Sequence, residues 1–466
     1  MPPSANTNLG YTPLDGGWGW AVVFGSFISI SFSTYTFLKS LTIYFKEIQE
    51  SVSVYLSVCL SIKPVCLSCL FVFPLIFPTC SILVNRYGCR PVVKAGGLMV
   101  GASFGTTILH FYICVGVIGG FGLVFNLQPA LKIIGKYFLV KRPVANGLAM
   151  AGSPVFLSTL APLNQFLFDK FRWRGSFLIL GSLLLSCCMA GSLMRPINRG
   201  VKEAVKSQLT SKQSGCAAKV NQFNDISLFK HRGFLIYLVG NVVMFFGFFS
   251  PVVFLAPYAK HRGIDEHSAV FLLSIFALVD MFSYPGTGLI ANTRWIRYKI
   301  QYFFSFAVAY NGILHLMCPL LPGYIRLVMY AVFFGMAFGM VCAFLFEVLM
   351  DLVGTQQLSS AVGLVTIIEC GPVLLRSPIS VKLVDIFNDH TYMYFACGVM
   401  MLVAGVFLFI MNYYNCRWLE QEDKHRKVEE LQIGAAKDLA AMEVAKDKRV
   451  ELKLNLEDKA THSTYK

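Results

Sequence analysis

Residues 234–258 read FLIYLVGNVVMFFGFFSPVVFLAPY, an apolar stretch without a single charged side chain. An α-helix that crosses the hydrocarbon core of a bilayer needs about 20 mostly apolar residues, and this stretch is long enough. Similar runs recur along the chain of 466 residues, separated by short polar segments. We therefore predict an all-α membrane protein whose spans lie near 18–38, 56–84, 92–110, 112–131, 143–165, 175–194, 234–258, 269–291, 299–320, 326–350, 358–383 and 392–414.

The composition agrees with this fold class. Hydrophobic residues make up 56% of the chain and charged residues only 14%, whereas soluble domains have about 25% charged residues. The N-terminal sequence MPPSANTNLGYTPLDGG lacks the basic region and the small-residue cleavage site of a signal peptide, so we expect the first apolar run to stay as a span. Most of the 14 cysteines lie in apolar runs, and the pair Cys66 and Cys69 has no partner pair or histidine cluster nearby. We expect no metal site and no cofactor.

The basic residues set the orientation in the membrane. The net charge is +15, and most Lys and Arg side chains fall in cytoplasmic segments when both chain ends are placed inside. Cytoplasmic loops of membrane proteins carry this excess of Lys and Arg. The charge therefore indicates a lipid bilayer, with both termini cytoplasmic, and not a nucleic-acid partner.

The two halves of the chain resemble each other. Span two is followed by ILVNRYGCRPVVKAGG (82–97) and span eight by LIANTRWIRYKIQYFF (289–304), each with an asparagine and two basic residues in a tight inner turn. A parallel repeat of two six-helix bundles is the layout of major-facilitator transporters. We expect Arg86 and Arg90 at the inner gate. The predicted segments are a cytoplasmic N-terminus (1–16), a first six-helix bundle (17–195), a cytoplasmic linker (196–232), a second six-helix bundle (233–415) and a cytoplasmic tail (416–466).

Ionisable side chains inside spans are costly and are default functional candidates. Lys39, at the outer part of span one, allows two interpretations: it takes up a proton in an apolar cavity and then binds an anionic substrate, or it reaches the outer interface. Asp280 lies in mid-span, and must be protonated, paired with a cation or facing water. The remaining candidates are Lys63, Glu347, Glu369 and Arg376.

Two long motifs carry a family resemblance. DGGWGW (15–20) opens span one, and KYFLVKRPVANGLAMAGSPV (136–155) opens span five. With these motifs the chain resembles the proton-linked monocarboxylate transporters of the major facilitator superfamily, from Asp15 to about Tyr414. The resemblance implies symport of H⁺ with lactate, pyruvate or ketone bodies across the plasma membrane. It also implies a single-span glycoprotein, embigin or basigin, as ancillary partner. We find no nucleophile–base motif or phosphate loop, so we do not expect an enzyme.

The resemblance also implies roles for individual residues. Lys39 matches the lysine of span one that binds both proton and substrate, and Asp280 matches the aspartate of span eight. The other matches are the pocket residues Tyr35, Asn146 and Phe346 and the basic pair Lys141 and Arg142 at the inner end of span five.

The chain departs from the family pattern at span eight. The family carries an arginine four residues after the aspartate, on the same helical face, where its planar guanidinium binds the substrate carboxylate. Here that position is Tyr284, which can donate one hydrogen bond but brings no charge. Further departures are Leu38 before Lys39, Lys63 in span two and Arg376 in span eleven.

Three outcomes remain open from these departures. Arg376 or Lys63 has taken over carboxylate binding, which gives an altered transporter. Transport runs through Lys39 alone. Finally, the chain is a diverged paralogue with weak or no transport that still binds the ancillary glycoprotein.

Overall fold

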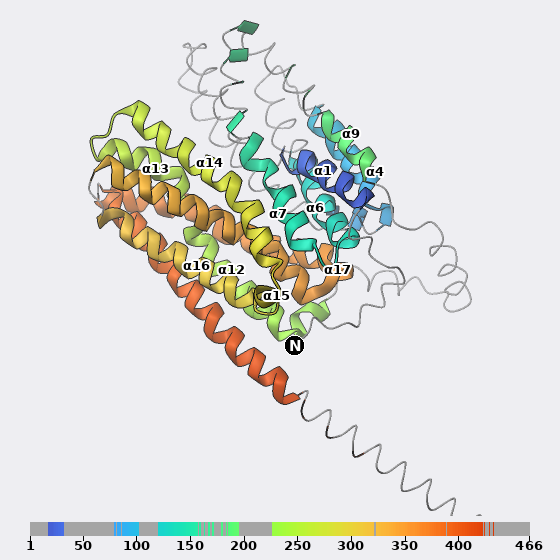
Figure 1. Cartoon of the computed structure of the whole chain (residues 1–466). Coiled ribbons are helices and arrows are strands. Elements are labelled where there is room, and N and C mark those ends of the chain that lie inside the picture. Colours follow the sequence, from blue (N-terminus) through green and yellow to red (C-terminus); the bar gives the residue numbers. More distant parts are fainter. Residues whose placement is uncertain are drawn as a thin grey trace, which may run out of the picture. The chain divides into compact units, whose positions relative to one another are not determined.

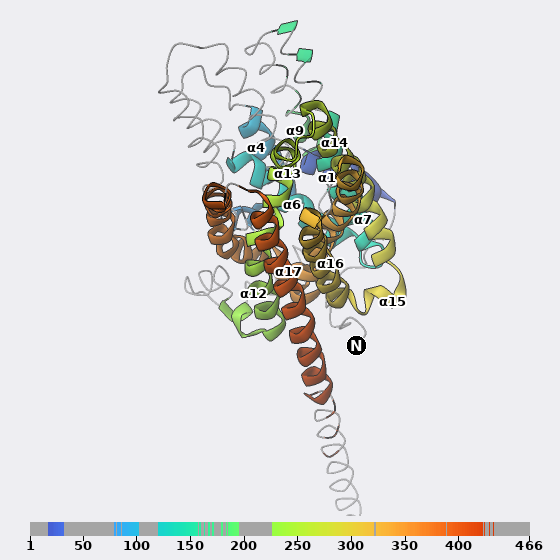
Figure 2. The ribbon, with the colours of Figure 1, turned by 90° about the vertical axis from the view of Figure 1, so that its left-hand side faces the viewer.

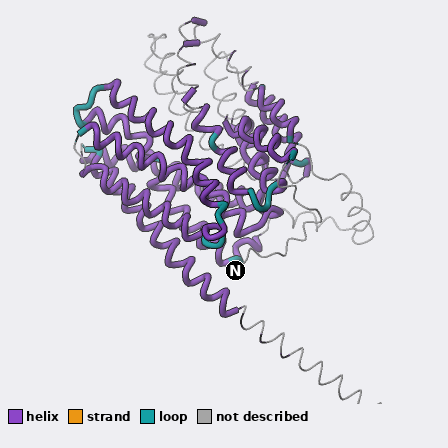
Figure 3. The backbone as a smooth tube through the Cα atoms, viewed as in Figure 1, coloured by secondary structure: helices purple, strands orange, loops and turns teal. Residues whose placement is uncertain are grey.

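The structure of the chain is a computed structural model. Tyr35 and Lys39 lie outside the residues that it describes, and so does Lys63. The described residues are 17–31, 79–101, 120–156, 185–194 and 226–422, with short gaps at 81, 85, 321–322 and 388, together with scattered positions between 158 and 183 and a few beyond 422. All regular structure in these ranges is helical, as Figure 3 shows.

Six helices in the described part of the chain are long and apolar enough to cross a membrane. They overlap the six spans predicted for the second half of the sequence. The last of them continues to Glu422 because its charged, helix-favouring residues extend it beyond the apolar run. The six are Arg232–His261, His267–Ala291, Ile300–Leu320, Tyr324–Gly354, Ser360–Phe387 and Thr391–Glu422.

Two of these spans contain a break with a local cause. Arg232–His261 consists of α12 (Arg232–Phe248) and α13 (Ser250–His261), which meet at Phe249. Pro251 stands in the first turn of α13, where a missing backbone N–H is tolerated. The long helix α17 (Tyr324–Phe387) joins two spans at Gly354, whose φ of 76° suits a residue without a Cβ.

Five further helical elements belong to the second half of the described chain. They are η2 (Ile226–Lys230), α14 (Glu266–Ala291), α15 (Arg294–Arg297), α16 (Ile300–Met317) and η3 (Cys318–Leu320). Figure 1 shows α12, α14, α16 and α17 running along one another, and α17 packs against each of the other three.

The first half contributes five described helices. They are α1 (Trp18–Ser31), α4 (Cys89–Gly101), α6 (Gly120–Tyr137), α7 (Arg142–Met150) and α9 (Ser186–Leu193). The helix α1 packs against α6, α7 and α9, and α4 packs against α6 and α9. Figure 2 views the same elements after a quarter turn. The two halves meet where α7 packs on α14 and where α6 and α7 pack on α17.

The helix α14 has one lipid-type face and one buried face. Large apolar side chains at intervals of seven and four residues are exposed, namely Phe271, Leu278, Phe282 and Leu289. The opposite face carries the buried residues Phe276, Asp280, Ser283, Tyr284 and Thr287. The exposed apolar stripe is suited to contact with lipid acyl chains. The face that carries Asp280, Ser283 and Thr287 packs against the rest of the protein.

The chain divides into two compact units, Met1–Phe409 and Ile410–Lys466. The first unit contains every element named above up to the middle of the last helix. In the second unit, residues 410–422 are helical.

Candidate functional site

Asp280 lies at a close approach of α14 and α17. Its side chain is buried, and a Cβ placed on Gly339 would lie 2.9 Å from Asp280 Oδ1 and 2.6 Å from Ser283. Ser283 Oγ donates to the Met336 carbonyl oxygen at 2.8 Å. A Cβ on Gly335 would lie 2.7 Å from the Phe276 carbonyl oxygen. The two glycines therefore let the backbones meet, as in small-xxx-small helix pairs, and they hold Asp280 inside the protein.

Tyr284 lies one helical turn after Asp280, and its ring packs among apolar side chains. It is 6% exposed and forms a buried cluster with Ala151 of the first half and Ala343 of α17. Phe27, Met150 and Cys342 pack against the same cluster. The position that the family resemblance assigns to a substrate-binding arginine is thus occupied by an uncharged ring in the contact between the halves.

The halves are in backbone contact next to this cluster. A Cβ on Gly147 would lie 2.5 Å from the Tyr284 carbonyl oxygen, and a Cβ on Gly288 would lie 2.7 Å from the Pro143 carbonyl oxygen. Both distances are far below a normal contact, so α7 and α14 can approach this closely only because these positions lack side chains. The glycines fix the end of α7 that begins at Arg142 against the second half.

Arg142 joins the two halves through a buried ion pair. Its Nε lies 2.6 Å from Glu347 Oε1, with side chains only 8% and 3% exposed, and its Nη2 lies 3.6 Å from the half-exposed Asp351. A buried charge is tolerated when it is paired and hydrogen-bonded. The guanidinium therefore ties the start of α7 to the end of the first span of α17.

A second arginine strengthens the same end. Arg297, which closes α15, donates to the carbonyl oxygens of Val140, at 2.6 Å, and Leu139. Both acceptors belong to the turn between α6 and α7. Together with Arg142, this contact joins the two halves at the end of the molecule where α7 begins.

The other three residues predicted for the inner gate are exposed to solvent. Lys141 is exposed next to Arg142, Arg86 is exposed shortly before α4, and Arg90 is exposed in the first turn of α4. The Arg86 guanidinium lies over the ring of its neighbour Tyr87, 5.4 Å from the centroid. Of the four basic residues assigned to this gate, the structure brings Arg142 into the contact between the halves.

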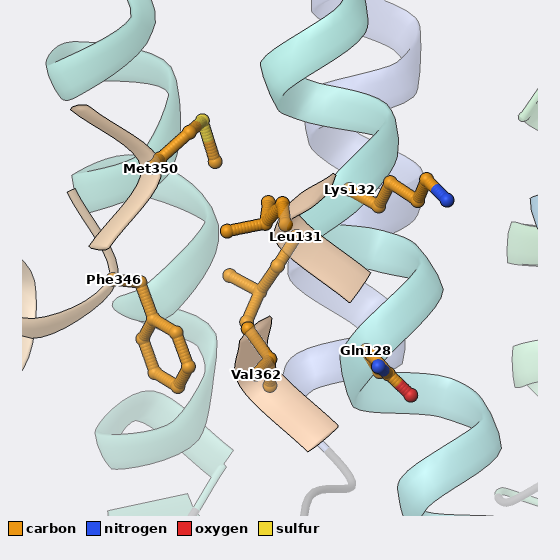
Figure 4. Close-up of a pocket in the computed structure, with 7 residues that line it drawn as sticks. Gln128, Leu131, Lys132, Phe346, Met350 and Val362 are labelled. Carbon is orange, nitrogen blue, oxygen red and sulfur yellow. The ribbon is translucent and has the colours of Figure 1, made fainter. Parts of the chain in front are cut away.

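Phe346 and Asn146 face the interior between the halves. Phe346 lines a small cavity between α6 and α17 together with Met350, Leu131 and Lys132, and the Lys132 ammonium points away from the phenyl ring (Figure 4). Asn146 is 2% exposed, and neither its Nδ2 nor its Oδ1 has a hydrogen-bond partner among the described residues. A buried amide without protein partners suits a position that binds a ligand or a water molecule.

The extra charges of span eleven lie beside span seven. The Arg376 guanidinium lies over the Phe249 ring, 4.5 Å from its centroid. The Phe249 ring in turn lies 5.7 Å from that of Phe338, the residue before Gly339. Glu369 is buried, and Asn241 Nδ2 donates to its Oε1 at 3.1 Å. These groups therefore line the contact of α12 and α13 with α17.

Sequence reasoning missed the roles of two buried residues. Glu347 was a candidate without an assigned partner, and the predicted span 112–131 stops just before Lys132, which is 5% exposed within α6. The available signal for Lys132 was the continuation of the helical pattern to Tyr137. No sequence signal pairs Glu347 with Arg142, because the two lie 205 positions apart.

Comparison with known proteins identifies the class of this fold. The family model of the Major Facilitator Superfamily matches residues 21–375. Among solved structures, the MFS proton:xylose symporter XylE is similar with a TM-score of 0.66 at 13% identity, covering 84% of this chain and 95% of its own. The E. coli fucose:proton symporter FucP is similar with a TM-score of 0.61 at 12% identity, covering 84% and 98%. The chain is a multi-pass membrane protein of the major facilitator superfamily.

Sequence relatives narrow the family. Human monocarboxylate transporter 2 is 55% identical over 441 residues, which cover 91% of each chain. Monocarboxylate transporter 1 of Mus musculus is 53% identical over 450 residues, covering 91% and 90%. The chain therefore belongs to the monocarboxylate transporter family, which confirms the resemblance seen in its motifs, and it is a transporter homologue and not an enzyme.

Proposed function

We propose that this protein moves short-chain monocarboxylates, such as lactate, pyruvate and ketone bodies, together with protons across the plasma membrane. The observation that carries this proposal is the buried Arg142–Glu347 ion pair between the two halves, beside close glycine contacts of α7 with α14. Contacts of this kind suit a molecule whose halves rock against each other around a central site. Both termini face the cytoplasm in this arrangement.

The transport cycle assigns one step to each group. Lys39 takes up the proton from outside and, as a cation, binds the carboxylate, with Tyr35, Asn146 and Phe346 lining the pocket. Asp280 exchanges protons with this binding site.

The Arg142–Glu347 ion pair then separates, the inner end opens, and substrate and proton leave together. Lys141, Arg86 and Arg90 attract the anion at the opened inner end. Embigin or basigin accompanies the protein to the cell surface.

The packing of Tyr284 favours a second candidate function. Because its ring is buried between the halves, α14 offers no guanidinium for the carboxylate at this position. In the second candidate, the protein has lost substrate flux and acts by binding the ancillary glycoprotein.

Uptake of radiolabelled lactate separates the two candidates. Cells that display the protein, with and without co-expressed basigin or embigin, are compared at acid and at neutral external pH. A proton symporter takes up more lactate at acid pH, since protons are a co-substrate. Surface display without pH-dependent uptake, combined with co-purification of the glycoprotein, supports the second candidate and rejects the first.

Restoring the missing cation sharpens this test. We expect Tyr284→Arg to raise lactate uptake about tenfold or more, since a hydrogen bond to a charged group contributes about 1.5–3 kcal/mol. Tyr284→Phe, which keeps the ring and removes the hydroxyl, is the matched control and leaves uptake within about twofold of the parent. If both variants behave alike, the span-eight cation does not limit transport in this protein.

A further inference from the structure

A buried carboxyl group of the second half is held by an amide. Glu369, in span eleven (Ser360–Phe387), is 8% exposed, and Asn241 of α12 is completely buried. Asn241 Nδ2 donates to Glu369 Oε1 at 3.1 Å, across 128 positions of sequence. This hydrogen bond therefore joins the first part of span seven to span eleven inside the protein, and the transport cycle outlined above does not use it.

Glu369 differs from the buried Glu347 because no cation is bound to it. The Glu347 carboxylate has Arg142 Nε at 2.6 Å. In the part of the chain that the structure describes, no Lys, Arg or His side chain forms an ion pair with Glu369. A carboxylate that is buried without a counter-ion is costly, and such a group is neutralised by taking up a proton. The surroundings of Glu369 therefore favour the protonated carboxyl group.

The groups around Glu369 do not supply a compensating charge. Among the described residues, Tyr237 of α12 is the titratable side chain that interacts with it electrostatically. The Tyr237 hydroxyl donates to the Leu345 carbonyl oxygen at 2.9 Å, and a phenol is neutral at physiological pH. On span eleven itself, the next charged residue is Arg376, two helical turns further on, whose guanidinium lies over the Phe249 ring.

The amide of Asn241 lacks one hydrogen-bond donor. Its Oδ1 is shut off from solvent and has no hydrogen-bond partner among the described residues. Buried polar atoms without a partner are rare and call for an explanation. A carboxylate only accepts hydrogen bonds, whereas a protonated carboxyl group also donates one. A proton on Glu369 would therefore be the donor that Asn241 Oδ1 lacks.

We propose that Glu369 is a proton-binding site and that its proton completes a contact of two hydrogen bonds with Asn241. Asn241 Nδ2 donates to Glu369 Oε1, and the protonated Glu369 Oε2 donates to Asn241 Oδ1. This pair holds α12 against span eleven. Loss of the proton removes the second hydrogen bond and leaves a carboxylate without a counter-ion, so the ionised form requires that the two spans separate and admit water.

Proton binding is thereby linked to the position of α12 relative to span eleven. The proton favours the closed contact, and opening of the contact favours release of the proton, because a ligand shifts a protein toward the state that binds it better. In the proposed transporter, Glu369 is a proton site in addition to Lys39 and Asp280. That role rests on the proposed function, whereas the binding of a proton by Glu369 does not.

Infrared spectroscopy of the full-length chain, purified in detergent, tests the site without any transport measurement. The carbonyl stretch of a protonated carboxyl group is separate from the bands of ionised carboxylates. At neutral pH we expect the parent to show this stretch and Glu369→Gln to lose the part that one carboxyl group contributes. The glutamine side chain keeps both hydrogen bonds to Asn241, since its N–H replaces the O–H, so this variant keeps the fold.

The matched control is an exposed carboxylate of the same span. Asp385 is exposed and ionised at neutral pH, so Asp385→Asn leaves the protonated-carboxyl band unchanged. If the parent and Glu369→Gln have the same band at neutral pH, Glu369 is ionised in the folded protein and the proposal is overturned.

The pH dependence of unfolding provides a second measurement. A glutamate in an unfolded chain has a pKa of about 4.3 and releases its proton above that pH, whereas the folded protein retains the proton of Glu369. The folded state then binds one more proton than the unfolded state, so its stability falls as the pH rises. Relative to Glu369→Gln, the folding equilibrium constant of the parent decreases by up to about tenfold per pH unit above pH 4.3. Parallel pH profiles of the parent and this variant contradict the proposal.

Lactate flux tests the role of the proton in transport. Exchange of lactate across the membrane needs only the protonated, loaded carrier, whereas net uptake also requires release of the proton. We expect Glu369→Gln to keep exchange within about twofold of the parent and to lower proton-driven net uptake at least about fivefold. Net uptake equal to that of the parent overturns this role. A parent without any flux rejects the proposed function, and the infrared and unfolding measurements still decide whether Glu369 binds the proton.

Discussion

Two polar positions in the contact between the halves have been filled in opposite ways. At the start of α7, Arg142 keeps a carboxylate partner at 2.6 Å inside the protein. On α14, Tyr284 occupies the position of an expected cation and packs against Ala151 and Ala343. Both positions lie in the contact between the halves, one as a buried ion pair and the other as a packed ring. The difference teaches that one contact between two helical bundles can keep a paired charge at one position and bury an uncharged ring at another.

The largest expected effect comes from breaking the Arg142–Glu347 ion pair. Arg142→Gln leaves the Glu347 carboxylate buried without a counter-ion, which costs about 3–5 kcal/mol. We expect a marked fall in the thermal unfolding midpoint of the protein purified in detergent. A double variant with Glu347→Gln recovers much of the loss, because no buried charge remains.

The neighbouring lysine provides the control for this experiment. Lys141 is exposed, so Lys141→Gln changes the free energy of unfolding by less than about 0.5 kcal/mol. If Lys141→Gln and Arg142→Gln lower the midpoint equally, general loss of positive charge explains the effect and the ion pair does not.

An intermediate effect is expected from inserting a methyl group between the halves. In Gly147→Ala the new Cβ meets the Tyr284 carbonyl oxygen at 2.5 Å, so α7 must move away from α14. Overpacking of this kind costs about 1–3 kcal/mol, and it lowers the unfolding midpoint. In the matched variant Gly286→Ala, the Cβ meets nothing within 4 Å. A midpoint for Gly147→Ala at or above that of Gly286→Ala contradicts the close contact.

The smallest effect is expected at the outer partner of Arg142. Asp351 lies 3.6 Å from the guanidinium, and its side chain is 36% exposed. Solvent screens such a pair, so Asp351→Asn costs about 0.2–1 kcal/mol. Glu347→Gln, tested in parallel by thermal unfolding, costs several times more. If Asp351→Asn and Glu347→Gln lower the unfolding midpoint equally, burial does not decide how strongly each carboxylate interacts with Arg142.

The sequence predicted the helical membrane fold and the family of this chain. Apolar runs of spanning length leave few alternatives, because backbone groups in a bilayer must be hydrogen-bonded within helices. The motifs at 15–20 and 136–155 are long, so they specify the family more narrowly than composition does. The departure at Tyr284 was also visible, since it is a change of residue type at one position of one helix.

The side-chain contacts between the halves and between α14 and α17 were not predictable from the sequence. The motif of Lys141 and Arg142 pointed to the inner gate, but both residues are basic and adjacent, and only the packing shows which one is buried. The GxxxG of Gly335 and Gly339 has the same form as many glycine pairs that pack against lipid. Its contact with Asp280 depends on which face α14 turns toward α17.

The sequence by itself therefore determined the helical membrane fold class and the family of this protein, because these follow from local composition and contiguous motifs. The tertiary structure alone decided that Arg142 meets Glu347, that Tyr284 packs between the halves and that Asn241 meets Glu369. Each of these pairs joins residues far apart in the chain. Whether such side chains touch depends on how helices rotate and pack around one another, which is set by the sum of many weak contacts.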